Sequence, residues 1–284
     1  MIVQRLNLSH DGRDRRVTCV LPEEVSPSAD LVLFLHGSLQ SGSVARRFTG
    51  NTFDELTSRG CVVVYPDGVD RHFNDHRVGF NEAARRLLIR DTSFLTSLPS
   101  HLQSHFGSDF GMDFGRIIGC GFSNGGQMLQ RLGLEAPGFL DGIACFGAPW
   151  PAADNVLPEL AAHYEDWVPV PVLSVQGTAD PLVPYEGGIS GIGNSNRGVA
   201  RSSVDSARFF AQLNGLDPED FTTTEVVEEV WVREWRREAE KPVQLWTVEG
   251  MGHLVPNPKE MDKKLGPSTN KVVGAELVAH FFGL

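Results

Sequence analysis

The stretch Gly121-Phe122-Ser123-Asn124-Gly125-Gly126 decides the fold that we expect for this chain of 284 residues. It follows a β-rich run at residues 116–120 and opens a helical stretch. The pattern Gly-x-Ser-x-Gly between a strand and a helix is typical of a nucleophilic serine on a sharp, strained turn, where neighbouring side chains would clash. The helix directs its N–H groups and its dipole toward the serine, which favours developing negative charge. A glycine-rich turn with an incidental serine is the alternative, and the setting favours Ser123 as a nucleophile.

Strands and helices alternate on both sides of this turn. The β-rich runs lie at residues 2–8, 16–21, 31–35, 61–65, 116–121, 141–146, 170–176 and 243–248, and the helical stretches at 53–58, 91–106, 125–134, 202–214 and 271–282. The first two runs flank a polar turn and predict a hairpin. The later alternation predicts parallel strands joined by crossovers. We therefore expect one α/β domain over residues 1–284, with about eight mostly parallel strands, helices on both faces and an antiparallel pair at the N-terminal edge.

Two segments depart from this alternation and predict an insertion around residues 185–240. Residues 187–198 (GGISGIGNSNRG) are rich in Gly, Asn and Ser, which predicts a loop. Residues 221–237 alternate apolar and polar side chains, which predicts an added strand or hairpin.

The composition is ordinary for a soluble globular protein, with 41% hydrophobic and 21% charged residues. The net charge of -11 argues against nucleic acid as a partner and, weakly, against a strongly anionic substrate. No apolar run reaches the roughly 18 residues that a membrane span needs. The N-terminus lacks the layout of a signal peptide, so we expect a cytoplasmic protein as written, or a secreted one if the chain is a processed form. The oligomeric state stays open.

The loop after residues 31–35 is the second part of the predicted site. A tetrahedral intermediate needs two backbone N–H donors near its oxygen. One comes from the residue after the nucleophile, Asn124, and the other from this loop. We assign the second donor to Ser38, with Leu39 as the alternative. We expect His36 to be a structural hydrogen-bonding group, because the base comes last in this chain order.

The acid and the base must follow Ser123 in the order nucleophile, acid, base. Asp180 comes just after the run at residues 170–176, where a rigid turn can direct a carboxylate across the edge of the sheet. An Asx-turn is its alternative role. Asp205 and Asp217 are rivals, but they lie in or after a helix.

Three histidines follow Ser123, and His253 is the one in a glycine-rich loop after a strand. His163 precedes the proposed acid, and His280 lies on a terminal amphipathic helix. The predicted chemistry is acyl transfer through Ser123, Asp180 and His253. It needs no cofactor and no metal, and no ligand-spaced cluster of His, Cys or Asp suggests one. The four cysteines, each in or beside a β-rich run, are expected to be buried thiols.

With these residues placed, the chain resembles the polyhydroxybutyrate depolymerase, feruloyl esterase and acetylxylan esterase group of α/β-hydrolases. The matching stretches are LHGSLQSG (35–42), YPDGVDRHFND (65–75), GFSNGGQM (121–128), VQGTADPLVPYEGG (175–188) and VEGMGH (248–253). The resemblance implies the α/β-hydrolase fold, the same triad, and Ser38 and Asn124 as oxyanion donors. The chain departs from the group at Leu254-Val255-Pro256, where family members often have a tryptophan, so the substrate does not follow from the resemblance.

The substrate pocket is the least determined part of this prediction. Phe73, Trp150 and Tyr185 are candidates for its walls, followed by Asn74, Trp167 and Pro184, since all fall near predicted loops at the carboxyl edge of the sheet. We expect a hydrolase of short acyl, hydroxyalkanoate or hydroxycinnamate esters, polymeric or small. The alternatives are a serine peptidase of the prolyl-oligopeptidase type and a non-catalytic binding protein on a hydrolase fold.

Overall fold

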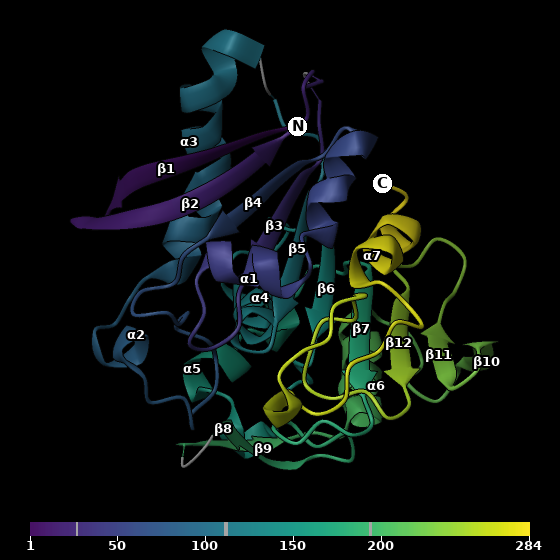
Figure 1. Cartoon of the computed structure of the whole chain (residues 1–284). Helices are drawn as coiled ribbons and strands as arrows, with labels where there is room; N and C mark the ends of the chain where they lie inside the picture. The colour runs from purple at the N-terminus through teal and green to yellow at the C-terminus, as the bar shows by residue number, and fades with distance from the viewer. Residues whose placement is uncertain (27, 111–112, 193–194) are drawn as a thin grey trace.

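A ten-stranded sheet forms the centre of the molecule in the computed structural model, which describes residues 1–26, 28–110, 113–192 and 195–284 (Figure 1). Its spatial order is β1-β2-β4-β3-β5-β6-β7-β12-β11-β10. The strands are β1 (Ile2–His10), β2 (Arg13–Leu21), β3 (Leu31–Leu35), β4 (Val62–Pro66), β5 (Ile117–Phe122), β6 (Gly142–Phe146), β7 (Val172–Gly177), β10 (Thr222–Val227), β11 (Val230–Trp235) and β12 (Val243–Val248). The strands from β4 to β12 run parallel, whereas β1, β2, β11 and β10 pair antiparallel. The predicted mostly parallel α/β sheet, with its antiparallel N-terminal hairpin, is confirmed.

Helices cover both faces of this sheet, as the alternation predicts. The helices are α1 (Gly42–Phe48), α2 (Ala83–Arg86), α3 (Asp91–Phe110), α4 (Asn124–Glu135), α5 (Pro158–Ala161), α6 (Ser203–Leu213) and α7 (Gly274–Phe282), with 3₁₀ helices η1 (Thr52–Arg59), η2 (Ala153–Asn155), η3 (Tyr164–Asp166) and η4 (Lys263–Leu265). Leu31, Leu33 and Leu35 of β3 share a core cluster with α3, α4 and α6. The intervening Val32 and Phe34 share the opposite cluster with α1, η1 and α7. Central strands are therefore continuous apolar runs, because both of their faces are covered.

The glycine-rich segment 187–198 is not the plain loop that its composition predicts. β8 (Gly188–Ile192) and β9 (Ser195–Ala200) form a separate antiparallel pair, and residues 193–194 between them lie outside the described residues. The Asn155 side chain donates to the carbonyl oxygens of Arg197 and Val199 at 3.0 and 3.1 Å. Backbone pairing and this amide stabilise the hairpin without large side chains, so composition was a poor guide. The hairpin lies beyond the carboxyl ends of β6, β7 and β12 (Figure 1).

The alternating segment 221–237 is the hairpin β10–β11, and it extends the main sheet through β12. This addition explains why the sheet has ten strands where the pattern predicts about eight. Within the described ranges, no helix is both long and apolar enough to cross a membrane.

All four cysteines are buried and free, as expected of small thiols at strand positions. Burial raises the pKa of Cys19 and Cys145 to about 12. A thiol with so high a pKa stays protonated at neutral pH, which makes it a poor nucleophile and a poor metal ligand. The cysteines therefore act as packing groups.

Trp150 lies in the core and not on a pocket wall. Its side chain is fully buried, and its ring makes edge-to-face contacts with Tyr164, Trp167, Phe209 and Phe210 at centroid distances of 5.1–6.2 Å. Such contacts stabilise a fold beyond the area that they bury. Trp150 therefore joins the loop after β6 to α6.

Replacement of Trp150 by alanine is expected to lower the free energy of unfolding by about 3–5 kcal/mol, because it leaves a large cavity among aromatic rings. Chemical denaturation monitored by circular dichroism would measure this loss. Trp231→Ala is the matched control, since the Trp231 side chain on β11 is 38% exposed and should cost far less. Equal stability of the two variants would contradict the packing role.

Candidate active site

Ser123 occupies the junction between β5 and α4, at the carboxyl edge of the sheet. Its backbone has φ 51° and ψ -116°, an unusual conformation for a residue with a side chain. The Ser123 N–H donates to the carbonyl oxygen of Phe146 at 2.8 Å, which ties the turn to β6. The Ser123 side chain is thus held at the N-terminus of a twelve-residue helix, partly open to solvent.

The glycines on either side of Ser123 are required by close approach. A Cβ on Gly121 would lie 2.6 Å from the carbonyl oxygen of Gly125. A Cβ on Gly125 would overlap the carbonyl oxygen of Leu35 on β3. The backbone therefore has no room for a side chain at Gly121 or Gly125, as the Gly-x-Ser-x-Gly pattern predicts.

Asp180 and His253 form a buried pair beside Ser123. The Nδ1 atom of His253 lies 2.6 Å from Oδ2 of Asp180, and both side chains are almost fully buried. The other carboxylate oxygen, Oδ1, accepts the N–H groups of Leu182 and Val183 at 2.8 Å each. Asp180 therefore makes an Asx-type turn with one oxygen and receives the imidazole Nδ1–H with the other. In the neutral tautomer that donates from Nδ1 to Asp180, Nε2 is the hydrogen-bond acceptor that a general base requires.

The sheet brings these two side chains together from distant parts of the chain. β7 and β12 are neighbouring parallel strands, with Gly177 in register with Val248, so the loops that follow them lie side by side. The His253 backbone N–H donates to the carbonyl oxygen of Leu265 at 2.5 Å. The ring of Phe122, next to the serine, packs against the imidazole with centroids 4.8 Å apart.

The rival residues lie elsewhere. Asp205 is exposed and caps α6 together with Ser202, and Asp217 is exposed after that helix. His163 pairs with Asp166 at 2.7 Å on the surface, and His280 is exposed on α7. Of the aspartates and histidines considered as acid and base, the structure brings Asp180 and His253 to the edge where Ser123 lies.

The loop after β3 leaves one free backbone donor at the site. The Leu39 N–H donates to the carbonyl oxygen of Arg71, and the Gln40 N–H to that of Gly37. Among the described residues, no acceptor is present for the N–H groups of Ser38 or Asn124. Ser38 also lines a cavity together with Ser123 and His253. Ser38, and not the alternative Leu39, is therefore positioned to donate to a ligand.

The Asn124 side chain anchors the start of α4 to the segment 73–75. Its Oδ1 atom accepts the Phe73 N–H at 2.8 Å, and its Nδ2 atom donates to the Asp75 carboxylate at 2.7 Å. Asp75 also receives Arg77 at 2.5 Å. Burial alone would raise the pKa of Asp75, but the Arg77 guanidinium outweighs it and lowers this pKa. Phe73 itself is fully buried, with its ring against His36, and is not a pocket wall.

His36 holds the loop that carries Ser38. Its Nε2 atom accepts the Gly68 N–H at 2.9 Å, and its Nδ1 atom lies 2.8 Å from the carbonyl oxygen of Gly37. Burial lowers the pKa of His36 to about 4, so the ring is neutral, as the acceptor at Nε2 requires. The predicted structural hydrogen-bonding role fits these contacts.

Two small cavities adjoin Ser123, each of about 10 Å³. Both are lined by Arg77, Ser123, Val183 and Ser190, and the second also reaches Arg197. The hairpin β8–β9 thus forms one wall of the site, which sequence reasoning missed. Tyr185 does not line either cavity. It is half-buried, and its hydroxyl bonds the Thr247 hydroxyl at 2.7 Å.

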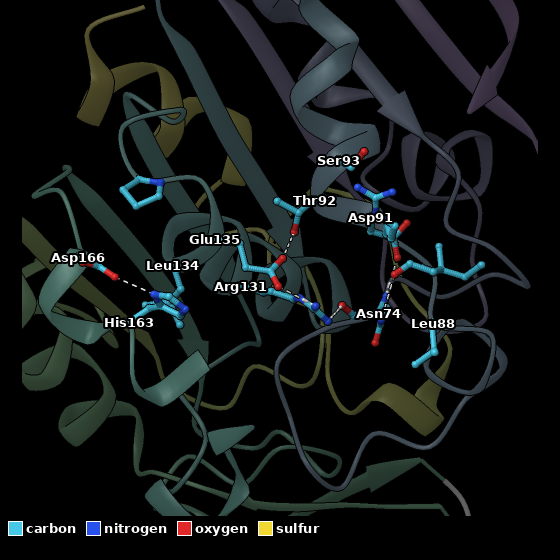
Figure 2. Close-up of a pocket in the computed structure, with 13 residues that line it drawn as sticks. Asn74, Leu88, Asp91, Thr92, Ser93, Arg131, Leu134, Glu135, His163 and Asp166 are labelled. Atoms are coloured by element: carbon cyan, nitrogen blue, oxygen red, sulfur yellow. Dashed lines mark hydrogen bonds and ion pairs between the residues drawn. The ribbon is translucent and has the colours of Figure 1, made fainter. Parts of the chain in front are cut away.

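A larger cavity of about 890 Å³ opens at the far end of α4, away from Ser123 (Figure 2). Its polar side chains mostly pair with one another. Arg131 bonds Glu135 at 2.7 Å and the carbonyl oxygen of Asn74 at 2.9 Å, and Asp91 pairs with Arg15 at 2.6 Å. These pairs leave little binding capacity for a ligand. Among the described residues, no cluster of three or more His, Cys, Asp or Glu could hold a metal ion.

Comparison with known proteins identifies the fold. No family model matches the chain. The structure is similar to acetyl xylan esterase from Aspergillus awamori, with a TM-score of 0.65 and 11% identity over 100% of this chain and 99% of that one. It is also similar to TT1662 from Thermus thermophilus, with a TM-score of 0.55 and 16% identity over 100% and 98% of the two chains. The architecture is that of the α/β-hydrolase fold.

One sequence relative covers a part of the chain. A segment of 103 residues is 32% identical to a protein named "Putative esterase NocK" from Nocardia uniformis subsp. tsuyamanensis. This segment spans 34% of this chain and 28% of that protein.

The buried histidines make stability depend on pH. His36 and His76 both have pKa values of about 4 in the folded protein, lowered by burial, whereas an unfolded histidine has a pKa of about 6.5. The unfolded chain therefore binds more protons between these values, and stability is lost as the pH falls from about 6.5 toward 4. At pH 5, each of these two histidines should lower the free energy of unfolding by about 2 kcal/mol.

His36→Gln keeps an acceptor for Gly68 and removes one such proton site. Between about pH 7 and pH 5, its melting temperature should fall by roughly 3 °C less than that of the wild type. Differential scanning calorimetry measures this slope, with His280→Gln, a change at an exposed histidine, as the control. Parallel curves for His36→Gln and the wild type would show the inference to be wrong.

Proposed function

We propose that this chain is a serine hydrolase of carboxylic esters, with Ser123 as nucleophile, His253 as base and Asp180 as the acid that orients it. One observation carries the proposal. Ser123 sits at φ 51° on a strand-to-helix turn and lines the same cavity as His253, whose Nδ1 atom lies 2.6 Å from the buried Asp180. This constellation is recognised by geometry and roles on many folds.

The proposed reaction begins with proton transfer from the Ser123 hydroxyl to Nε2 of His253. The alkoxide attacks the ester carbonyl, and the N–H groups of Ser38 and Asn124 stabilise the oxyanion. The Asp180 carboxylate stabilises the imidazolium that forms. His253 then protonates the leaving alcohol, and water repeats the cycle on the acyl-enzyme. No cofactor or metal takes part in these steps.

We propose an ester rather than a peptide as the substrate because of the proteins to which this chain is similar. The names of the structural neighbour from Aspergillus awamori and of the sequence relative from Nocardia uniformis both refer to esterases. The proposal covers short acyl, hydroxyalkanoate and hydroxycinnamate esters alike. The two cavities beside Ser123, at about 10 Å³ each, have room for about one water molecule, so their volume does not select among these acyl groups. Phe73 and Trp150, expected as aromatic walls, are buried in the core.

Ser123→Ala is expected to lower kcat for 4-nitrophenyl acetate by about 10⁴-fold or more, because triad members act as a unit. His253→Gln should cause a loss of similar size. Release of 4-nitrophenolate by the purified variants measures both. The exposed pair His163–Asp166 offers a matched control, since His163→Gln removes a histidine from a similar ion pair and should leave turnover intact.

Two results would count against this assignment. Retention of more than a few per cent of wild-type turnover by Ser123→Ala would exclude the proposed nucleophile. Equal losses in His253→Gln and His163→Gln would indicate a general effect of histidine replacement and not removal of the base. Labelling of the wild type, but not of Ser123→Ala, by a fluorophosphonate probe gives an independent test by mass spectrometry.

A further inference from the structure

Arg197 on β9 is a buried cation beside the proposed nucleophile. Its side chain is only 6% exposed, and its Nη2 atom pairs with Glu82 at 2.6 Å. The remaining nitrogens, Nε and Nη1, are buried and have no hydrogen-bond partner among the described residues. Arg197 lines the cavity that also contains Ser38, Ser123 and His253. The hairpin therefore places an arginine with two unused donors in the wall of the cavity beside Ser123.

These unused donors set Arg197 apart from the other arginines that have a buried nitrogen without an acceptor. Arg15, Arg131 and Arg208 each leave one nitrogen, Nε, without an acceptor in the described part of the chain, whereas Arg197 leaves two. A buried donor without an acceptor costs about 1–3 kcal/mol, and more when it is charged. A ligand that accepts hydrogen bonds from Arg197 would remove this cost.

The charged side chains that line the cavity favour an anionic ligand over a neutral one. Arg77 lines it together with Arg197, whereas no carboxylate of the described residues does, and the partner of Arg77, Asp75, is fully buried outside the lining and also bonded to Asn124. Glu82, the partner of Arg197, is 26% exposed, so its charge is partly screened by solvent. Two arginines therefore line a small cavity in which hydrogen bonds to charged groups are strong.

The backbone holds Arg197 in this position. The Asn155 side chain donates to the Arg197 carbonyl oxygen at 3.0 Å, and its Oδ1 atom accepts the Gly79 N–H at 2.9 Å. The guanidinium lies over the Phe80 ring, 5.0 Å from its centroid. A side chain restrained in this way loses little entropy when it binds a ligand.

We propose that Arg197 is a specificity-determining residue that binds a carboxylate carried by the substrate close to its scissile ester bond. This inference rests on the proposed esterase function and names the substrate class: short esters with a free carboxylate. The substrate carboxylate accepts hydrogen bonds from the nitrogens that Glu82 leaves unused. In this proposal, Glu82 competes with the substrate carboxylate for the positive charge of Arg197 and does not itself bind the substrate.

Two pairs of esters test whether the enzyme recognises the charge of the substrate, because the two members of each pair differ in charge but have similar shapes. Monoethyl succinate and ethyl succinamate carry a carboxylate or a neutral amide on the acyl group, and O-acetylglycolate and O-acetylglycolamide carry them on the alcohol. A pH-stat assay yields kcat/KM for each compound. The wild type should prefer the carboxylate member of at least one pair by about tenfold or more, the value of one hydrogen bond to a charged group.

Three variants of the full chain test whether this preference depends on Arg197. Arg197→Gln should lower the ratio of carboxylate to amide kcat/KM at least tenfold. Glu82→Gln should leave the ratio equal or raise it, because it removes the competing carboxylate. Arg46→Gln is the control, since Arg46 also belongs to an ion pair, with Asp54 at 2.6 Å, but lies outside both cavities, and the ratio should not change.

The outcomes distinguish this inference from the proposed function. Hydrolysis of 4-nitrophenyl acetate by the wild type, together with no carboxylate preference in either pair, would overturn the inference and leave the esterase intact. An equal fall of the ratio in Glu82→Gln and Arg197→Gln would show that the ion pair is structural, which also overturns it. Absence of any ester hydrolysis by the folded wild type would reject both.

Discussion

The contact between the start of α4 and the end of β3 is the constraint on which the site depends. Because Gly125 has no Cβ, the helix can approach the carbonyl oxygen of Leu35 closely. The same turn holds Ser123 at φ 51° and ψ -116° and begins α4 beside the end of β3, which leads into the loop that carries Ser38. The proposed nucleophile, the proposed oxyanion donors and the positive end of the helix dipole are thus brought together at one close backbone contact.

Buried hydrogen bonds made by Asn124 and His36 hold this arrangement in place. Asn124 bonds the backbone of Phe73 and the carboxylate of Asp75, so the helix N-terminus is joined to a segment far away in the sequence. His36, neutral because it is buried, joins the next loop to Gly68. These contacts are short, buried and mutually satisfied, and such networks restrict a site to one geometry.

The parts of this structure that sequence predicted are those with local signals. Ser123 directly follows β5, and Asp180 and His253 lie in the loops just after β7 and β12. Parallel strands bring their carboxyl ends to one edge, so chain order and turn residues were enough to propose these three residues as a site. Trp150 follows β6 in the same way, yet its ring points into the core, because Phe209 and Phe210 of α6 arrive there from a later part of the chain. Side-chain direction at such a position depends on tertiary contacts that no local pattern contains.

The charge at the site, like the direction of the Trp150 side chain, depends on the tertiary structure and cannot be read from the sequence alone. The net charge of -11 is a property of the whole surface, and at physiological salt it acts over distances of about 8 Å. It can slow the approach of an anion, but the potential inside a closed cavity depends on the groups that line it. Arg197 comes from the segment 187–198 that composition predicted to be a loop, whereas no sequence signal singled out Arg77, and only the folded chain places the two together beside Ser123. A protein with an acidic surface can therefore hold a cationic site, and total charge is a guide to association rates rather than to the chemistry of the bound substrate.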